Sequence, residues 1–246
     1  MIAILIALAA AQGLPAGDVA RFQSCTALVR SQPENGVASA NDWLAKGGGM
    51  LARQCLGLGY AALEQWAPAA AAFEQAAREA ETKQDPRRAD FWVQAGNAWL
   101  AAGDGAKARV ALDAALATGL PAGELRGEIH LDRARAGVQI GDLAGARKDI
   151  DHGIQLVPAD PFAWHLSSGL AMREGDLVRA RKDSGMALSL APDDPDVLLH
   201  AGNVAAAAGD DKTARELYTR AAAAAPASAA GKAAQAALAA RASAPK

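Results

Sequence analysis

Residues 195–228 read PDVLLHAGNVAAAAGDDKTARELYTRAAAAAPAS, with a Gly-Asp pair at Gly209-Asp210. The same dipeptide occurs at three earlier places: Gly103-Asp104, Gly141-Asp142 and Gly175-Asp176. The last three copies are 34 residues apart. A fixed period of this length is the signature of a solenoid, in which copies of one small unit stack because no unit can bury its apolar face alone.

Other residues recur in phase when a 34-residue unit is numbered so that this glycine is position 15. In residues 195–228, a small residue stands at positions 8 and 20 (Gly202 and Ala214), and Tyr218 stands at position 24. The spacing defines five units: 50–83, 89–122, 127–160, 161–194 and 195–228. Small residues at positions 8, 20 and 27 remove bulk where two helices cross, so that larger residues at positions 4, 7, 11 and 24 fill the gaps.

The same pattern places the ends of the helices. A glycine at position 15 can end one helix in the left-handed conformation, and an aspartate at position 16 can cap the next. Proline stops the second helix at three places: Pro158, Pro192 and Pro226. Asp160-Pro161 and Asp194-Pro195 then supply an N-cap followed by proline at the first helical position. We therefore expect two antiparallel helices in each unit.

This arrangement resembles the tetratricopeptide repeat family, whose unit has Trp, Leu, Gly and Tyr on its first helix and Ala, Phe, Ala and Pro afterwards. Residues 89–122 carry Trp92, Gly96, Trp99 and Ala108 in register. Three residues of 127–160 depart from the pattern: His130, Gly137 and Gly153. Residues 50–83 have Glu64-Gln65 in place of the Gly-Asp pair. The resemblance implies an all-α fold, a right-handed α-solenoid of stacked helix-turn-helix repeats.

Segments outside the five units are expected to cap the array. Residues 17–49 predict an N-terminal helix pair that ends at Gly47-Gly48-Gly49, and residues 229–246 predict a C-terminal capping helix and tail. Extra residues around 82–88 and 121–126 interrupt the period and are expected to form loops or helix extensions.

The first sixteen residues, MIAILIALAAAQGLPA, resemble a secretory signal peptide because an apolar run precedes small residues. No Lys or Arg precedes the run, so a misplaced start codon or a buried N-terminal helix is the alternative. No later stretch is apolar enough to cross a bilayer, so we expect a protein that is not integral to the membrane. Export would place it in the periplasm or outside the cell; without a signal peptide it would be cytoplasmic.

The composition of the chain excludes several classes of protein. The chain is 51% hydrophobic with a formal charge of -2, which excludes wholesale disorder and offers no basic field for nucleic acid. Its 66 alanines and few β-branched or aromatic residues favour helices. The four histidines lack the spacing of paired metal ligands on one helix, and no nucleophile or phosphate-binding motif is present. We predict no catalytic residues, no metal and no cofactor.

Two cysteines, Cys25 and Cys55, are the only ones in the chain. In an oxidising compartment they would form a disulfide that pins the N-terminal helix pair to the first repeat. The alternative is two buried thiols that act as small apolar residues.

The resemblance implies that positions 2, 5, 6, 9, 12 and 13 of each first helix line a concave groove that binds an extended peptide. The candidates at these positions are Gln94, Asn97, Asp132, Arg135, Gln139, His165, Arg173, His200 and Asn203. The family uses asparagine at position 9 to hold a peptide backbone or terminal carboxylate, and arginine can pair with a carboxylate. The family's five-residue carboxylate clamp is not reproduced because lysine is missing from these positions, so a chaperone C-terminus is not indicated.

Three functions remain open. The first is a non-enzymatic, exported scaffold that binds a segment of a partner protein in the groove. The second is a structural or oligomerising component of an envelope complex that uses its convex face or terminal helices and leaves the groove as a solvated surface or occupied by its own terminal helix. The third is a regulatory subunit of an enzyme whose chemistry lies in a partner chain.

Overall fold

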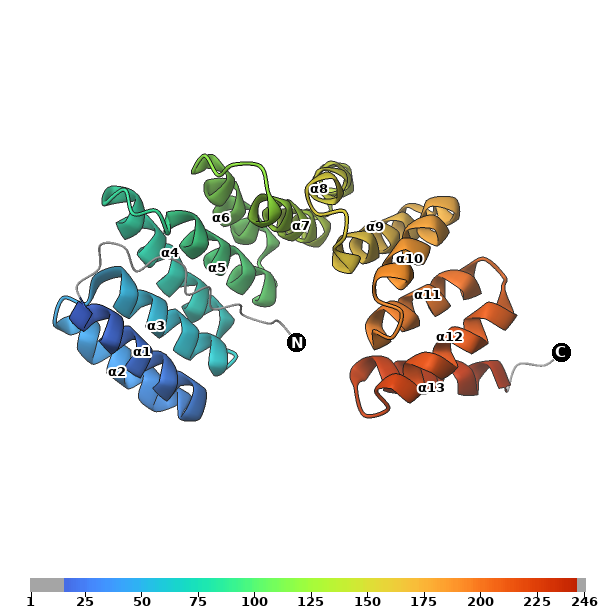
Figure 1. Cartoon of the computed structure of the whole chain (residues 1–246), viewed down its shortest axis with the longest axis horizontal. Helices are drawn as coiled ribbons and strands as arrows, with labels where there is room; N and C mark the ends of the chain where they lie inside the picture. The colour runs from blue at the N-terminus through green and yellow to red at the C-terminus, as the bar shows by residue number, and fades with distance from the viewer. Residues whose placement is uncertain (1–15, 243–246) are drawn as a thin grey trace. The chain divides into compact units, whose positions relative to one another are not determined.

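The computed structural model describes residues 16–242, and these form thirteen α-helices without a β-strand (Figure 1). The predicted all-α fold class is confirmed. The predicted signal peptide lies outside the described residues, apart from Ala16, where the first helix begins. Among the described helices, none combines the length and the apolar character needed to span a bilayer.

The chain divides into two compact units, Met1–Leu120 and Pro121–Lys246. The first contains α1 (Ala16–Ser31), α2 (Pro33–Ala45), α3 (Gly49–Ala62), α4 (Trp66–Thr82), α5 (Arg88–Ala101) and α6 (Gly105–Ala117). The second contains α7 (Glu124–Gln139), α8 (Leu143–Leu156), α9 (Pro161–Glu174), α10 (Leu177–Leu190), α11 (Pro195–Ala207), α12 (Asp211–Ala224) and α13 (Ala229–Ala242).

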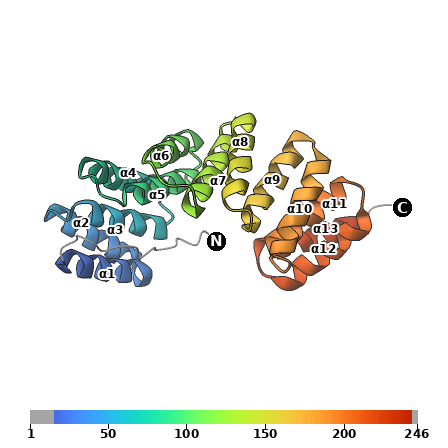
Figure 2. The ribbon, with the colours of Figure 1, turned by 45° about the horizontal axis from the view of Figure 1, so that its top comes forward.

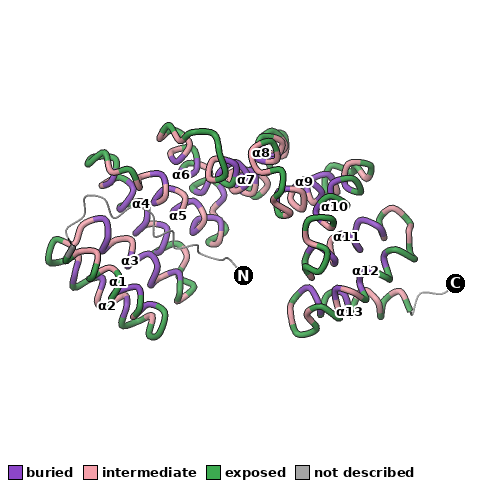
Figure 3. The backbone as a smooth tube through the Cα atoms, in the orientation of Figure 1, coloured by how far each residue is buried: buried purple, intermediate pink, exposed green. Residues whose placement is uncertain are grey.

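Within each unit, every helix packs against the next one in the chain, and the helices form antiparallel pairs (Figure 2). Each pair from α3 to α12 overlaps one of the five 34-residue segments, but α3 and α5 begin one residue before their segments and α7 begins three residues before its segment. The number of repeats stays a prediction. The helix α1 packs against both α2 and α3, and α13 packs against α12 and α11. The helix sides that face neighbours are buried, whereas most turns are exposed (Figure 3).

The turns within the pairs have the predicted geometry. Four glycines at position 15 adopt a positive φ of 76–80°: Gly103, Gly141, Gly175 and Gly209. The aspartate after each glycine accepts a hydrogen bond of 2.9–3.1 Å from a backbone N–H three residues on, which caps the second helix. Asp160 caps α9 by accepting from the N–H of Phe162, and Asp194 caps α11 by accepting from the N–H groups of Asp196 and Val197. Each is followed by proline at the first helical position.

Glycines at position 8 let the two helices of a pair approach closely. A Cβ at Gly96 would lie 2.6 Å from Cγ of Leu112, and one at Gly202 would lie 2.7 Å from Cε1 of Tyr218. Large residues at position 24 therefore occupy the space that a side chain at position 8 would need. The alanines at position 20 are essentially inaccessible to solvent, as Ala108 and Ala214 show.

Departures from the repeat pattern are accommodated locally. Gly153 stands where other units have alanine, and a Cβ there would lie 2.6 Å from Cδ2 of Leu131, so the larger Leu131 fills the space. Ser168 replaces the glycine at position 8, and its hydroxyl donates to the carbonyl oxygen of Ala180 at 2.8 Å. The buried hydroxyl is thus satisfied, which avoids the penalty for an unpaired polar group.

Candidate functional site

The nine candidate residues of the first helices are divided between the two compact units. Gln94 and Asn97 lie on α5 of the first unit. The other seven lie on α7, α9 and α11 of the second unit: Asp132, Arg135, Gln139, His165, Arg173, His200 and Asn203. Each set therefore forms a surface of its own, which we call the amide face and the arginine face, respectively.

The amide face joins two neighbouring first helices through side-chain amides. Nε2 of Gln54 on α3 donates to Oε1 of Gln94 on α5 at 3.3 Å. One turn further along α5, the buried Oδ1 of Asn97 has no hydrogen-bond partner among the described residues. Leaving a buried amide oxygen without a hydrogen bond costs about 1–3 kcal/mol.

The arginine face has carboxylates near the start of α7. Burial raises the pKa of Glu128, and the neighbouring carboxylates of Glu124, Asp132 and Asp160 raise it further. One turn on, Nη1 of Arg135 donates to Oδ1 of Asp132 at 2.9 Å. The guanidinium of Arg135 also lies 5.9 Å from the centre of the Phe162 ring on α9. Arg135 therefore bridges α7 and α9 within the second unit.

Two histidines meet on this face. The rings of His165 on α9 and His200 on α11 have their centres 4.6 Å apart, and Nε2 of His200 is 2.8 Å from Oγ of Ser168. Burial lowers the pKa of His200 to about 4, and the neighbouring His165 adds to the effect. Burial also lowers the pKa of His165, although the carboxylates of Asp196 and Asp194 oppose the shift. Both rings are thus neutral at pH 7.

A small pocket of about 200 Å³ opens between α7, α8 and α9. It is lined by Ala134, Arg135, Val138, Ile150, His165, Leu166, Gly169, Leu170 and Arg173. Three of the predicted residues, Arg135, His165 and Arg173, therefore lie around one pocket. The register of the repeats indicated these three, whereas the contribution of Ile150 from the second helix α8 was not expected.

The remaining candidates lie elsewhere on the same face. Oδ1 of Asn203 accepts a hydrogen bond from the hydroxyl of Tyr218 at 2.9 Å, so one of its two lone pairs is already engaged. Asn203 and Gln139 are both exposed. The two asparagines at position 9 thus differ. The side-chain oxygen of Asn97 has no hydrogen-bond partner among the described residues, whereas that of Asn203 is hydrogen-bonded within its own repeat.

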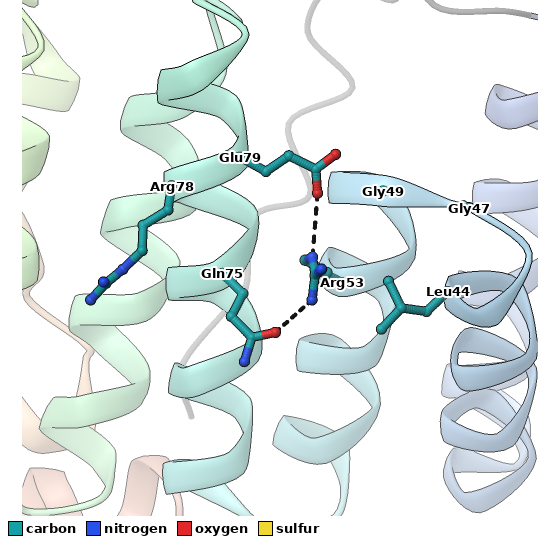
Figure 4. A pocket seen from close by; sticks show the side chains of 7 residues that line it. All are labelled: Leu44, Gly47, Gly49, Arg53, Gln75, Arg78 and Glu79. Atoms are coloured by element: carbon teal, nitrogen blue, oxygen red, sulfur yellow. Dashed lines mark hydrogen bonds and ion pairs between the residues drawn. The ribbon is translucent and has the colours of Figure 1, made fainter.

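A larger hollow of about 650 Å³ lies on the first unit, away from the positions that the repeat pattern indicated. It is lined by Leu44, Gly47, Gly49, Arg53, Gln75, Arg78 and Glu79 (Figure 4). Arg53 occupies its centre, where Nε donates to Glu79 at 3.3 Å and Nη1 donates to Gln75 at 2.5 Å. Burial opposes ionisation of Glu79, but hydrogen bonds and charge from Lys83 and Arg53 outweigh it and lower its pKa. Arg53 is thus paired within the hollow, whereas Arg78 pairs with Glu74, which is not one of its lining residues.

His130 and His152 contact each other and a carboxylate in the second unit. Nδ1 of His130 is 2.9 Å from Asp149, and Arg133 donates two hydrogen bonds to the same carboxylate. The rings of His130 and His152 stack with their centres 4.5 Å apart. Stacked rings do not converge on one ion, and the described residues contain no group of side chains arranged to hold a metal.

The Sγ atoms of Cys25 and Cys55 are bonded, and their Cα atoms are 6.3 Å apart. The bond joins α1 to α3, and both residues are buried. The N-terminal helix pair is thereby attached covalently to the first helix of the following pair.

Solved structures resemble this chain in fold, although their sequence identity to it is low. No protein-family model and no curated protein matches the chain. Among solved structures, PilW, described as a widely conserved type IV pilus biogenesis factor, is 20% identical with a TM-score of 0.72, covering 89% of this chain and 99% of its own. PilF of Pseudomonas aeruginosa is 17% identical with a TM-score of 0.67, covering 89% and 96%, respectively.

A third solved structure is YrrB, described as a TPR protein with an unusual peptide-binding site. It is 16% identical to this chain with a TM-score of 0.53, covering 79% of this chain and 96% of its own. At these identities the comparison establishes the fold alone.

Proposed function

The chain has the fold of tetratricopeptide repeat proteins, and on that premise we propose that it is a non-enzymatic scaffold that binds a peptide segment of a partner protein on its first helices. Scaffolding of protein partners is the function that the fold supports. The finer proposal assigns binding to the amide face and the arginine face.

One observation carries this proposal: Arg135, His165 and Arg173 extend from two successive first helices to the same pocket. Arg173 is exposed, and its guanidinium forms no hydrogen bond or ion pair within residues 16–242. An arginine held beside apolar side chains without a partner of its own is available to a carboxylate. A bound segment with an acidic group matches this charge.

We also propose that the protein is exported to the periplasm or beyond. The apolar run at residues 2–11 supports export, and so does the disulfide between Cys25 and Cys55, because such bonds persist in oxidising compartments. PilW and PilF, whose names refer to pilus biogenesis, make an envelope complex a reasonable place to look for the partner.

A second candidate function uses the opposite side of the second unit. On α10, the side chain of Val178 is 83% exposed, and Met186 and Leu190 are also exposed. These are the apolar side chains that α10 would bring to a contact with a second protein. In that case the protein would be a structural or oligomerising component whose first helices stay solvated.

The test is a pull-down from an envelope extract of the producing cells with protein that begins at Ala16, followed by mass spectrometry. One variant carries Asn97→Ala, Arg135→Ala and Asn203→Ala on the first helices. A matched variant carries Val178→Ser, Met186→Ser and Leu190→Ser on α10. Circular dichroism first establishes that both are as helical as the unsubstituted protein.

We expect a partner that is lost from the first variant and retained by the second. Loss from the α10 variant alone would move the function to that surface. Retention of every partner by both variants would contradict both candidate functions.

A further inference from the structure

The exposed side of α10 is more apolar than the same side of the second helices beside it. Val178 and Met186 occupy positions 18 and 26 of their unit, and their exposed fractions are 83% and 38%. The corresponding residues in the preceding and following units are, respectively, Ala144 and His152, and Lys212 and Arg220. Since the neighbouring units fold with alanine or polar residues at these positions, packing within the second unit does not require apolar side chains there.

Two cations lie among these apolar side chains. Arg181 and Lys182 follow Val178 by three and four residues, about one helical turn, and both are exposed. Arg181 is close enough to Asp210 to act on its charge, whereas Lys182 forms no ion pair with a described residue. The only carboxylate of α10, that of Asp183, is buried. The exposed side of this helix therefore carries positive charge and no carboxylate.

Most carboxylates around α10 are engaged within the fold. Three of them form ion pairs with arginines: Glu174 with Arg147, Asp151 with Arg179, and Asp193 with Arg220. Asp176 accepts the backbone N–H of Arg179 as the N-cap of α10. The exposed carboxylates of Asp211 and Glu216 lie on α12, which also carries exposed cations. The positive charge of the exposed α10 side is therefore available to an external anion.

We infer that the exposed side of α10 docks on the surface of a membrane that contains anionic lipids. Val178, Met186 and Leu190 enter the boundary between headgroups and acyl chains, and Arg181 and Lys182 bind lipid phosphates. A helix in this position lies in the membrane interface and does not span it. Peptide binding is assigned to the first helices and this contact to a second helix, so the inference goes beyond the proposed function and does not depend on it.

Charge and shape favour a lipid surface over another protein chain. Arg181 and Lys182 lie near the middle of Leu177–Leu190, so a twofold pairing of α10 with its copy would bring four cations together. Protein partners usually anchor large side chains in well-packed pockets, and neither of the two hollows described above is lined by a residue of α10. A fluid, negatively charged surface matches this helix without a pocket.

The test places an environment-sensitive fluorophore at Val178. The protein begins at Ala16, so that the apolar run at residues 2–11 cannot bind lipid itself. Its two cysteines are bonded and buried, which leaves the thiol of Val178→Cys for labelling with nitrobenzoxadiazole. Vesicles of phosphatidylglycerol and phosphatidylcholine in equal amounts should brighten this label and shift its emission to shorter wavelength. The same label on Val110→Cys, at a 68% exposed valine of α6, is the matched control and should not respond.

Co-sedimentation with the same vesicles measures the partition coefficient. An Arg181→Gln, Lys182→Gln variant should bind at least about tenfold more weakly, because each cation near an anionic surface strengthens binding several-fold. The variant with serine at Val178, Met186 and Leu190 should lose a similar factor, since binding also scales with buried apolar area. A control that carries Lys46→Gln and Lys232→Gln loses the same charge from exposed positions outside α10 and should bind normally.

Absence of binding to these vesicles, or equal binding to vesicles of phosphatidylcholine alone, would overturn the inference, as would an equal response of the labels at Val178 and Val110. Sedimentation velocity without lipid tests the second copy: a dimer that the three serine substitutions dissociate would assign the surface to self-association instead. The variant with Asn97→Ala, Arg135→Ala and Asn203→Ala should bind vesicles normally, which separates this contact from peptide binding by the first helices.

Discussion

Glu64 has a φ of +57° in the turn between α3 and α4, the left-handed conformation that Gly103 adopts with a φ of +77° in the turn between α5 and α6. The first repeat therefore keeps the backbone shape of the turn without the residue that favours it. Because a Cβ clashes with the neighbouring carbonyl in this conformation, Glu64 carries a strain that Gly103 does not.

Replacing Glu64 with glycine should stabilise the protein by about 0.5–1 kcal/mol, since relief of the strain exceeds the added flexibility of the unfolded chain. Gly103→Ala is the converse change and should destabilise by about 1–2 kcal/mol. No atom lies within 4 Å of a Cβ at Gly103, so that loss would report backbone conformation alone. Urea unfolding followed by circular dichroism measures both; a neutral Gly103→Ala would refute the argument.

Ala108 and Ala214 lie at position 20 of their units, and both are 0% exposed. Substitution of either by leucine should overpack the crossing of two helices and cost about 1–3 kcal/mol. Ala106→Leu, at an exposed position on the same helix as Ala108, is the control and should change stability little. If the buried and exposed substitutions lower the melting temperature equally, the assigned register is wrong.

The link between Cys25 and Cys55 closes a loop with a sequence separation of 30 residues. A Cys25→Ala, Cys55→Ala double variant should lose about 3–4 kcal/mol of unfolding free energy, because the unfolded chain gains freedom without the crosslink. Unfolding the unsubstituted protein in a reducing agent should give a similar loss, and the reducing agent should leave the variant unchanged. Equal stability of oxidised and reduced protein would contradict a stabilising bond.

His200 should make the stability depend on pH. In the unfolded chain its pKa is near 6.5, and burial lowers it to about 4 in the folded protein. Between these values the unfolded state binds more protons, so the free energy of unfolding falls as the pH drops from 7 to 4. The loss attributable to His200 is at most about 3 kcal/mol and should level off below pH 4.

The measurement is urea unfolding at several pH values for the unsubstituted protein and for His200→Gln. Carboxylates titrate in the same range, so the difference between the two curves isolates the histidine. A difference that is constant from pH 7 to 4 would show that His200 does not carry this pH dependence.

The helix boundaries were predictable because their causes are local. A glycine in the left-handed conformation and an aspartate that accepts an N–H three residues on act within one turn, so Gly175-Asp176 reveals a helix end and a helix start. The turn at Glu64-Gln65 was harder to place because it keeps the shape and lacks both residues.

The candidate site was predictable only in part. The repeat register pointed to Arg135, His165 and Arg173, all of which line one pocket. The register assigned the same role to Asn97 and Asn203. In the structure they differ, because the Tyr218 hydroxyl donates a hydrogen bond to Asn203 whereas the side-chain oxygen of Asn97 has no partner among the described residues. The hollow around Arg53 was not predictable from the sequence, in which only the glycines that follow α2 mark its place.

The sequence by itself determined the all-α repeat, its period and the ends of most helices, since these depend on residues only a few positions apart. Tertiary structure alone decided which polar groups are satisfied and where space remains. The pocket of about 200 Å³ in the second unit exists because side chains from α7, α8 and α9 converge on it. Its size and charge depend on how those side chains pack against one another, which a repeat pattern does not specify.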